Sequence, residues 1–234
     1  MKTSPRVLLS AAFAVAQVTL VASAASAEPS FGNRETFWQA DVGIRSMYIT
    51  NPGYDTVSTD NSLVQFSLGA SRTIWDQGQL SFAPGIVWDY GQSSAAARGQ
   101  PTSLEAHHLA LTLEGRYHFL PWMYGLVRAA PGVLHQRVEL EDPSAVSSYV
   151  ARKWAFAFDA AAGVAFLLAP QQEVARSPVR WWLAGEGGYS YAGSGSLAMA
   201  PDTEAGDPRR TGAVDLGSLA LRGGFFRIYA AVTY

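Results

Sequence analysis

Eight stretches of this chain alternate apolar and polar side chains with a period of two. In residues 37–49, for example, Trp38, Val42 and Ile44 fall on one face, whereas Asp41 and Arg45 fall on the other. Because successive side chains of a strand point to opposite sides, this period predicts β-strands. The predicted strands cover residues 37–49, 63–74, 79–90, 104–119, 122–138, 150–168, 179–192 and 219–234. We therefore expect an all-β fold.

The connections between the predicted strands are of two kinds. Short reversals follow the second strand, at Asp76-Gln77-Gly78, and the fourth strand, at Leu120-Pro121. Longer polar connections follow the first, third, fifth and seventh strands, at residues 50–62, 91–103, 139–149 and 193–216, and the connection after the sixth, 169–178, is of moderate length. Long loops on one side, short turns on the other and an even strand count are typical of an antiparallel up-and-down transmembrane β-barrel.

The two faces of the predicted strands differ in a way that favours a membrane barrel over a soluble one. One face holds nearly all the large apolar side chains, and the other holds Gly, Ala, Ser and scattered charges. In a membrane barrel the apolar face turns outward. Aromatic residues gather near both strand ends, as at water–lipid interfaces, although Trp and Tyr are common in any sheet. They are Trp38, Trp75, Phe119, Trp122, Trp181 and Tyr234 on the short-turn side and Tyr48, Trp88, Tyr90, Tyr189 and Tyr191 on the long-loop side.

Two Ala-Pro-Gly sequences lie within predicted strands, around Pro84 and Pro131. Proline has no N–H to donate to a neighbouring strand and is expected at sheet edges or bulges. We therefore expect a β-bulge at each of these two sites.

The first 27 residues have the layout of a secretory signal peptide. Lys2 and Arg6 form a basic start, an apolar run extends from Val7 to about Ala22, and small residues precede Glu28. The run is too short and too rich in Ala and Ser for a good membrane anchor. We expect cleavage after residue 27, a short periplasmic segment over residues 28–36, and a single barrel domain over residues 37–234.

Charge and cysteine content narrow the function classes. The formal net charge of −2 becomes about −4 once the two basic residues of the leader are removed, so no nucleic-acid partner is expected. The chain has no Cys, which excludes disulfide bonds and lipid attachment at the cleavage site. About 207 mature residues suit one β-barrel domain.

The last predicted strand places Phe226, Ile228, Ala230, Val232 and Tyr234 on one face and ends on an aromatic residue. It resembles the C-terminal sorting strand of bacterial outer-membrane barrels. By layout and terminal strand, the whole mature chain resembles the small eight-stranded barrels of the OmpA/OmpX type. The resemblance implies a structural or partner-binding scaffold in the bacterial outer membrane that displays surface loops and has no periplasmic domain. Its implied partners are outer-membrane lipids, the barrel-assembly machinery and other envelope proteins, with no cofactor. The long loops are then expected outside the cell and the short turns in the periplasm.

Some barrels of this kind modify lipids, so polar residues near the loop ends of the strands are candidates for catalysis. They are His107, His108, His135, Glu105, Thr102 and Ser103. A nucleophile–base pair could form among them, but no recognisable lipase pattern accompanies it. His107 and His108 are adjacent and point to opposite faces of a strand, which disfavours a shared metal ion. We expect no catalytic, cofactor-binding or metal-binding residue and no enzymatic activity, and lipid modification is the least favoured alternative.

Charged residues on the inward face fall in one band across the middle of the predicted barrel. They are Asp41, Arg45, Glu114, Arg128, Glu186 and Arg227. Isolated buried charges are costly, whereas opposite charges can pair. The sequence therefore predicts a charge network that plugs the lumen, with Glu186 and Arg227 as neighbours on adjacent strands. The alternative is a ring of charges that lines a narrow channel for ions or small solutes.

Overall fold

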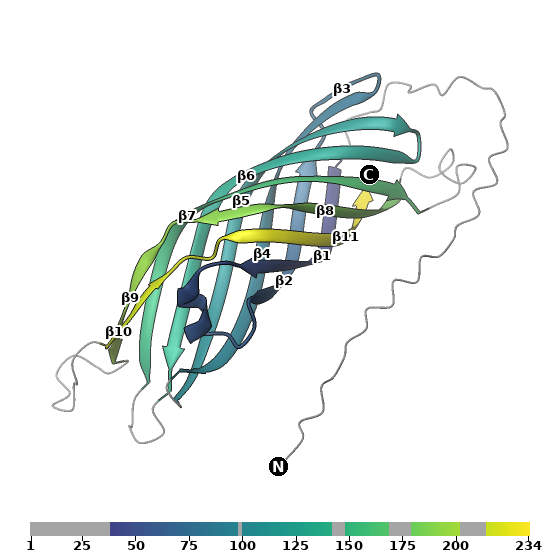
Figure 1. Ribbon diagram of the computed structural model, residues 1–234. Coiled ribbons are helices and arrows are strands. Elements are labelled where there is room, and N and C mark those ends of the chain that lie inside the picture. The colour runs from purple at the N-terminus through teal and green to yellow at the C-terminus, as the bar shows by residue number, and fades with distance from the viewer. Residues whose placement is uncertain (1–37, 98–99, 142–147, 169–178, 202–213) are drawn as a thin grey trace, which may run out of the picture. The chain divides into compact units, whose positions relative to one another are not determined.

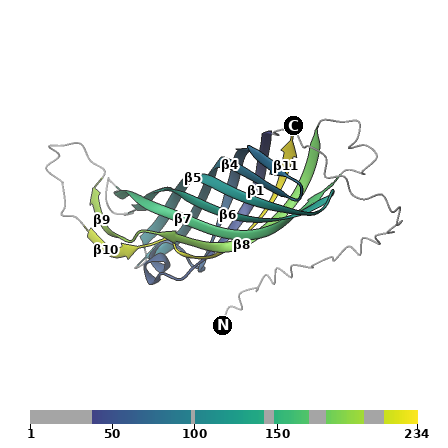
Figure 2. The same cartoon turned by 90° about the horizontal axis from the view of Figure 1, so that it is seen from above.

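The computed structural model describes residues 38–97, 100–141, 148–168, 179–201 and 214–234. The predicted signal peptide and the segment over residues 28–36 lie outside these ranges. Within them, eight antiparallel strands close into a barrel (Figures 1 and 2). The barrel strands are β1 (Trp38–Ile49), β2 (Ser62–Arg72), β4 (Leu80–Ala97), β5 (Gln100–Leu120), β6 (Met123–Leu140), β7 (Tyr149–Leu167), β8 (Arg180–Ala192) and β11 (Gly223–Thr233). All eight predicted strands are thereby confirmed.

The barrel is closed by the first and last of these strands. β1 pairs with β2 on one side and with β11 on the other, in register from Gln39 opposite Thr233 to Ile49 opposite Gly223. One residue further along, the N–H of Trp38 donates to the carbonyl of Tyr234 at 2.8 Å, and the N–H of Tyr234 donates to the carbonyl of Trp38 at 2.9 Å. The seam therefore extends to the last residue.

Four further elements extend the two ends of the barrel. β3 (Trp75–Gln77) pairs with β4 on the short-turn side, where Gly78 adopts a φ of 58° in the two-residue reversal. On the long-loop side, the 3-10 helix η1 (Pro52–Thr56) follows β1, and β9 (Gly195–Pro201) pairs with β10 (Val214–Leu219). Figure 1 shows β9 and β10 at the end away from the C-terminus. No helix in the described ranges is long and apolar enough to cross a membrane.

Two segments that we expected to be loops contain strand. Residues 91–103 continue β4 and β5 as a paired ladder up to Ala97 opposite Gln100, and residues 193–216 contain β9 and β10. The reason is a reversal of polarity along the strands. Near the middle of the barrel the exposed side chains are apolar, as for Ile86 and Leu111, whereas nearer the loops the exposed side chains are polar and the buried ones apolar. A search for apolar outer faces therefore ends these strands too early.

The polarity of the wall within the membrane region is the one expected of a transmembrane barrel. Outward side chains such as Ile44, Leu111 and Phe156 are about 60% exposed, while inward Arg45 and Glu186 are buried. Beyond this region, the long-loop ends of the strands enclose an apolar core, as a soluble barrel does. The lumen thus holds charges in its middle and apolar side chains toward the loops.

The predicted bulges at Pro84 and Pro131 are wrong, because the register continues unchanged past both residues. The carbonyl of Phe82 accepts from Ile74 on the β2–β3 side of β4, so by alternation the nitrogen of Pro84 faces the same side. On that side the pairing with β2 has already ended, so no carbonyl of β2 needs an N–H donor at this position. Pro131 remains opposite Phe158 on β7. The pairing with β5 is interrupted next to Pro131 and resumes in the same register.

Candidate functional site

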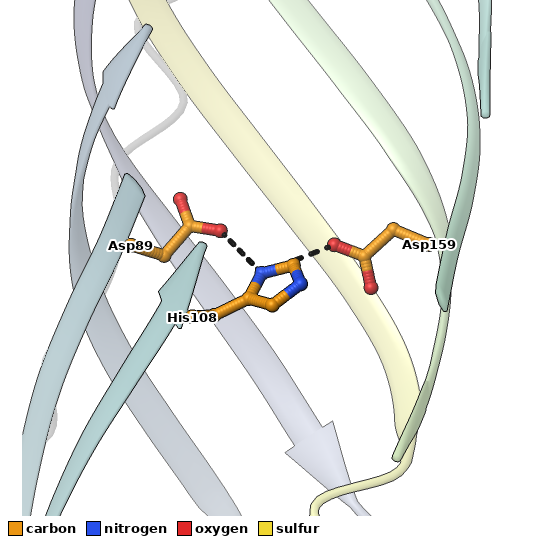
Figure 3. A group of neighbouring side chains, drawn as sticks. All are labelled: Asp89, His108 and Asp159. Atoms are coloured by element: carbon orange, nitrogen blue, oxygen red, sulfur yellow. Dashed lines mark hydrogen bonds and ion pairs between the residues drawn. The ribbon is translucent and has the colours of Figure 1, made fainter. Parts of the chain in front are cut away.

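The buried charges of the lumen form two groups. The group nearer the loops, which we call the loop-side cluster, consists of Arg45 on β1, Asp89 on β4, His108 on β5 and Asp159 on β7. Arg45 Nη1 lies 2.7 Å from Asp89 Oδ2 and 2.8 Å from Asp159 Oδ2. His108 Nδ1 lies between the same two carboxylates, at 3.1 Å and 3.7 Å (Figure 3). One guanidinium and one imidazole therefore hold two carboxylates that come from opposite parts of the wall.

The loop-side cluster also has the composition of a metal site. One oxygen each of Asp89 and Asp159 and one nitrogen of His108 lie within 4.8 Å of one another. However, the guanidinium of Arg45 already contacts both carboxylates from the position that a cation would take. The local charge is balanced by Arg45, and the geometry favours an ion-pair cluster over a metal centre.

The second group, which we call the turn-side network, lies closer to the short turns. Its members are Asp41 on β1, Glu114 and Arg116 on β5, Arg128 on β6, Glu186 on β8 and Arg227 on β11. Arg128 is its centre, because Nη2 lies 2.6 Å from Glu114 Oε2 and Nη1 lies 2.9 Å from Glu186 Oε1. The network ends in two further pairs, Arg116 with Glu114 at 2.6 Å and Arg227 with Asp41 at 2.8 Å.

Neutral side chains complete the turn-side network. Arg116 donates to the amide oxygen of Gln39 at 2.9 Å, and Arg128 donates to the hydroxyl of Tyr229 at 3.3 Å. The guanidinium of Arg227 also lies over the ring of Tyr229, 4.4 Å from its centroid. These contacts provide partners for arginine N–H groups that no carboxylate contacts. They thereby offset part of the free-energy cost of desolvating the arginines.

Small residues make room for the charged ones. Gly69 on β2 lies opposite Asp41, and a Cβ at this position would come within 2.4 Å of Asp41 Oδ2. Gly163 on β7 lies opposite Glu186, where a Cβ would lie 2.7 Å from the Cβ of that glutamate. The glycines of the inward face therefore determine where long charged side chains fit.

The structure brings together five of the six residues that the sequence singled out. Asp41, Glu114, Arg128, Glu186 and Arg227 are linked in the turn-side network, and Glu186 and Arg227 are direct neighbours across β8 and β11, with 3.5 Å between Oε1 and Nε. Arg45 belongs instead to the loop-side cluster.

Sequence reasoning missed four members of the two groups. They are Asp89, His108, Arg116 and Asp159. All four share the inward phase of their strands, so the period-two pattern could have identified them. The prediction left them out because it considered only a set of charges in one band across the middle of the barrel.

An apolar layer covers the loop-side cluster. Among the described residues, seventeen buried side chains form this layer, including Met47, Leu63 and Leu134 on the barrel wall and Leu221 between β10 and β11. The segment around η1 adds Tyr54, which is fully buried and donates its hydroxyl to the carbonyl of Ser62. The layer separates the charges from the loop side of the barrel.

Hydrogen bonds fix the η1 segment over this layer. Thr102 Oγ1 on β5 donates to the carbonyl of Thr56 at 2.7 Å, and Ser93 Oγ on β4 donates to the carbonyl of Val57 at 3.1 Å. The first loop is thereby attached to the inner wall of the opposite strands. It forms a cap over the apolar layer.

A second layer lies on the short-turn side. Tyr124, Trp182 and Tyr229 pack together with smaller residues, and Trp182 Nε1 donates to Thr233 Oγ1 at 3.2 Å. Next to them, Ser81 Oγ and His118 Nε2 are 3.1 Å apart and both residues are buried. The short-turn mouth is therefore lined by rings and a hydroxyl–imidazole contact, which border a cavity of about 30 Å³.

The candidate catalytic residues near the loops are divided between the two faces. His108 and Thr102 are buried inside, where His108 joins the loop-side cluster and Thr102 holds η1. The others, His107, His135, Glu105 and Ser103, lie on the outer wall. His107 Nε2 contacts Glu105 Oε1 at 3.3 Å. Within the described part of the chain, none of these histidines forms a hydrogen bond with Ser103 or Thr102.

A closed eight-stranded barrel with an apolar outer wall and a charged interior is a small transmembrane β-barrel, of the class found in bacterial outer membranes. Its layout is that of the OmpA/OmpX type. A scan of the sequence against protein-family models matches none, and a search of the curated proteins finds no relative.

Several solved structures match this chain at low sequence identity. Neisserial surface protein A matches with a TM-score of 0.45 at 12% identity, over 85% of this chain and 97% of that chain. Ail, the attachment invasion locus protein of Yersinia pestis, matches with a TM-score of 0.48 at 9% identity, over 86% and 100%. The outer membrane protease OmpT of Escherichia coli matches with a TM-score of 0.46 at 8% identity, over 86% and 97%. At these identities the likeness concerns the fold alone.

Proposed function

We propose that this protein is a sealed outer-membrane anchor that presents its loops and the loop-side extension of its barrel to other envelope components or to another cell. The observation that carries the proposal is the contact of Arg45 with Asp89 and Asp159, which ties three strands together across the lumen. Because side chains block the lumen of such a barrel, its function depends on its loops and outer surface.

The small size of the internal cavities supports a plugged lumen. Among the described residues, two cavities of about 10 Å³ each lie beside the loop-side cluster, and a third of about 30 Å³ lies beside Arg116 at the short-turn mouth. The first two are close to the minimum volume for one water molecule. Eight strands also enclose an interior that side chains can fill.

A narrow channel is the first alternative, because the same charges could line a selectivity ring. This alternative requires the ion pairs, the apolar layer and the η1 cap to move aside together. Conductance across a planar bilayer distinguishes the two functions, since the anchor passes no current and the channel does.

A lipid-modifying enzyme is the second alternative. The Ser81–His118 contact is a hydroxyl–imidazole pair of the kind that activates a nucleophile. However, both residues are buried, and the cavity that they line has a volume of only about 30 Å³, which is too small for an acyl chain. Unchanged lipid A mass spectra in a deletion strain would agree with the anchor, whereas a lost modification would favour the enzyme.

The partner is sought most directly by site-specific crosslinking in living cells. A photoreactive amino acid in place of exposed Ser196, on β9, should capture the partner of the loop-side extension. The same amino acid in place of Leu111, on the lipid-facing wall, is the matched control. Equal protein adducts from both positions, or none from Ser196, would contradict display by the extension.

A further inference from the structure

The outer wall of β4, β5, β6 and β7 changes character in three successive cross-strand rows. The first row is apolar and consists of Trp88, Leu109, Val133 and Phe156. The second row carries four rings and consists of Tyr90, His107, His135 and Trp154. The third row is polar and consists of Gln92, Glu105, Arg137 and Arg152. On each strand, only four residues separate the apolar side chain of the first row, which suits lipid hydrocarbon, from the polar side chain of the third row, which suits lipid headgroups.

The second row is a continuous band of rings. The centroids of Tyr90 and His107 are 4.8 Å apart, those of His107 and His135 are 6.2 Å apart, and those of His135 and Trp154 are 4.7 Å apart. Amphipathic rings prefer the level of the lipid headgroups. This band therefore marks the loop-side boundary of the membrane on this wall.

Two arginines lie next to the band of rings on its loop side, and some of their N–H groups have no hydrogen-bond acceptor among the described residues. Arg137 on β6 and Arg152 on β7 are direct cross-strand neighbours, and like charges in this arrangement repel. Arg137 has one partner, Glu139, at 3.2 Å, while its Nε is buried without a hydrogen bond. The exposed side chain of Arg152 forms no hydrogen bond or ion pair with any described residue. An anion between the two guanidiniums would relieve the repulsion and accept hydrogen bonds from their exposed N–H groups.

A groove opens beside these arginines. It has a volume of about 370 Å³ and is lined chiefly by Gln92, Ser94, Ser103, Glu105, Arg137 and Glu139. Hydroxyl, amide and carboxylate groups offer both donors and acceptors, which is the chemistry that sugar hydroxyls need. The rings of the second row border the groove on the membrane side.

We propose that this wall binds the phosphorylated sugar headgroup of an outer-leaflet glycolipid. Arg137 and Arg152 take the phosphate, the polar groove takes the sugar, and the acyl chains lie along the apolar first row. The occupant is a lipid because the apolar first row lies four residues from the polar third row on each of the same strands. The assignment to the outer leaflet rests on the loop side facing outward, which cysteine labelling tests separately.

The test measures which lipids remain bound to the full-length barrel in native mass spectra. Protein refolded in detergent is offered diphosphoryl lipid A, phosphatidylglycerol, and the deacylated sugar phosphate of the same lipid A. We expect diphosphoryl lipid A to be retained in preference to phosphatidylglycerol. The double variant Arg137→Gln/Arg152→Gln should lower its retention about tenfold, because two charge-assisted contacts are lost.

Arg222→Gln is the matched control, because Arg222 is an exposed arginine just before β11, which lies opposite β5 in the ring of strands. It should retain lipid A as the unmodified protein does. Equal retention of phosphatidylglycerol, or unchanged retention by the double variant, would overturn the site. Equal competition by the deacylated headgroup would assign the groove to a soluble glycan and overturn the lipid. If the double variant does not fold, the retention of lipid A by the single variant Arg152→Gln is measured instead, because this change removes no contact with the described chain.

Discussion

Arg45 Nη1 lies 2.8 Å from Asp159 Oδ2 and thereby joins β1 to β7 across the interior of the barrel. On the shorter way around the wall, β8 and β11 separate these two strands. The same nitrogen contacts Asp89 on β4 at 2.7 Å. One side chain thus crosslinks three parts of the wall, and its guanidinium lies 4.2 Å from the centroid of the Phe225 ring, which belongs to the apolar layer.

Replacing Arg45 by Met should destabilise the barrel strongly, because two buried carboxylates lose their partner. Breaking a buried ion pair from one side costs about 3 to 5 kcal/mol. Urea unfolding of the refolded protein, followed by tryptophan fluorescence, measures this loss. The second change in Arg45→Met/Asp159→Asn should recover part of it, since one unpaired charge is removed. Arg222→Met is the control with an exposed arginine, and an equal unfolding midpoint for Arg45→Met and Arg222→Met would disprove the role of the cluster.

Replacing Glu186 by Gln should lower the heat stability of the barrel in detergent without opening a conductance. Glu186 faces Arg128 at 2.9 Å and Arg227 at 3.5 Å, so the variant leaves two buried guanidiniums with less negative charge. Heat-dependent migration on gels gives the transition temperature. Glu139→Gln is the control, because the Glu139–Arg137 pair is partly exposed and such pairs contribute about 0 to 1 kcal/mol. A transition temperature equal to that of the control would count against the network.

Cysteines at Ser196 and Gln77 should report opposite sides of the membrane. Both residues are exposed, Ser196 on β9 at the loop side and Gln77 at the tip of the β3–β4 reversal, and the chain has no native Cys. An impermeant maleimide applied to intact cells should label the first and not the second, because long loops of such barrels face outward. Labelling at Gln77 alone would invert the orientation.

Deleting Tyr234, or replacing it by Asp, should impair assembly in the outer membrane. The residue ends the outward apolar face of β11 and exchanges backbone hydrogen bonds with Trp38 at the seam, so it is not a frayed end. The amount of folded, heat-modifiable barrel in membranes measures the effect. Tyr48→Asp provides an exposed tyrosine at the loop end of β1 as a control. Normal levels of the Tyr234 variants would contradict a sorting role.

The sequence predicted the strands well because period-two alternation is a local property. It predicted their ends poorly because the polarity of the faces reverses near Leu104 and Glu105, where the wall leaves the membrane region. The inward phase of the strands identified Arg128, Glu186 and most of their partners, whereas the prediction left out Asp89 and Asp159, the partners of Arg45. Which charges meet depends on the shear of the closed barrel and on nearby glycines such as Gly69, and neither can be derived from one strand at a time.

We propose that the lumen is sealed by its own charges and covered by apolar side chains. The most direct test is the current through planar bilayers that contain the purified, refolded protein, with an open porin as a positive control for insertion. The sealed barrel predicts no current steps above the baseline, for the unmodified protein and for Glu186→Gln alike. Steady, ion-selective current steps from the unmodified protein would contradict the plug and establish the channel instead.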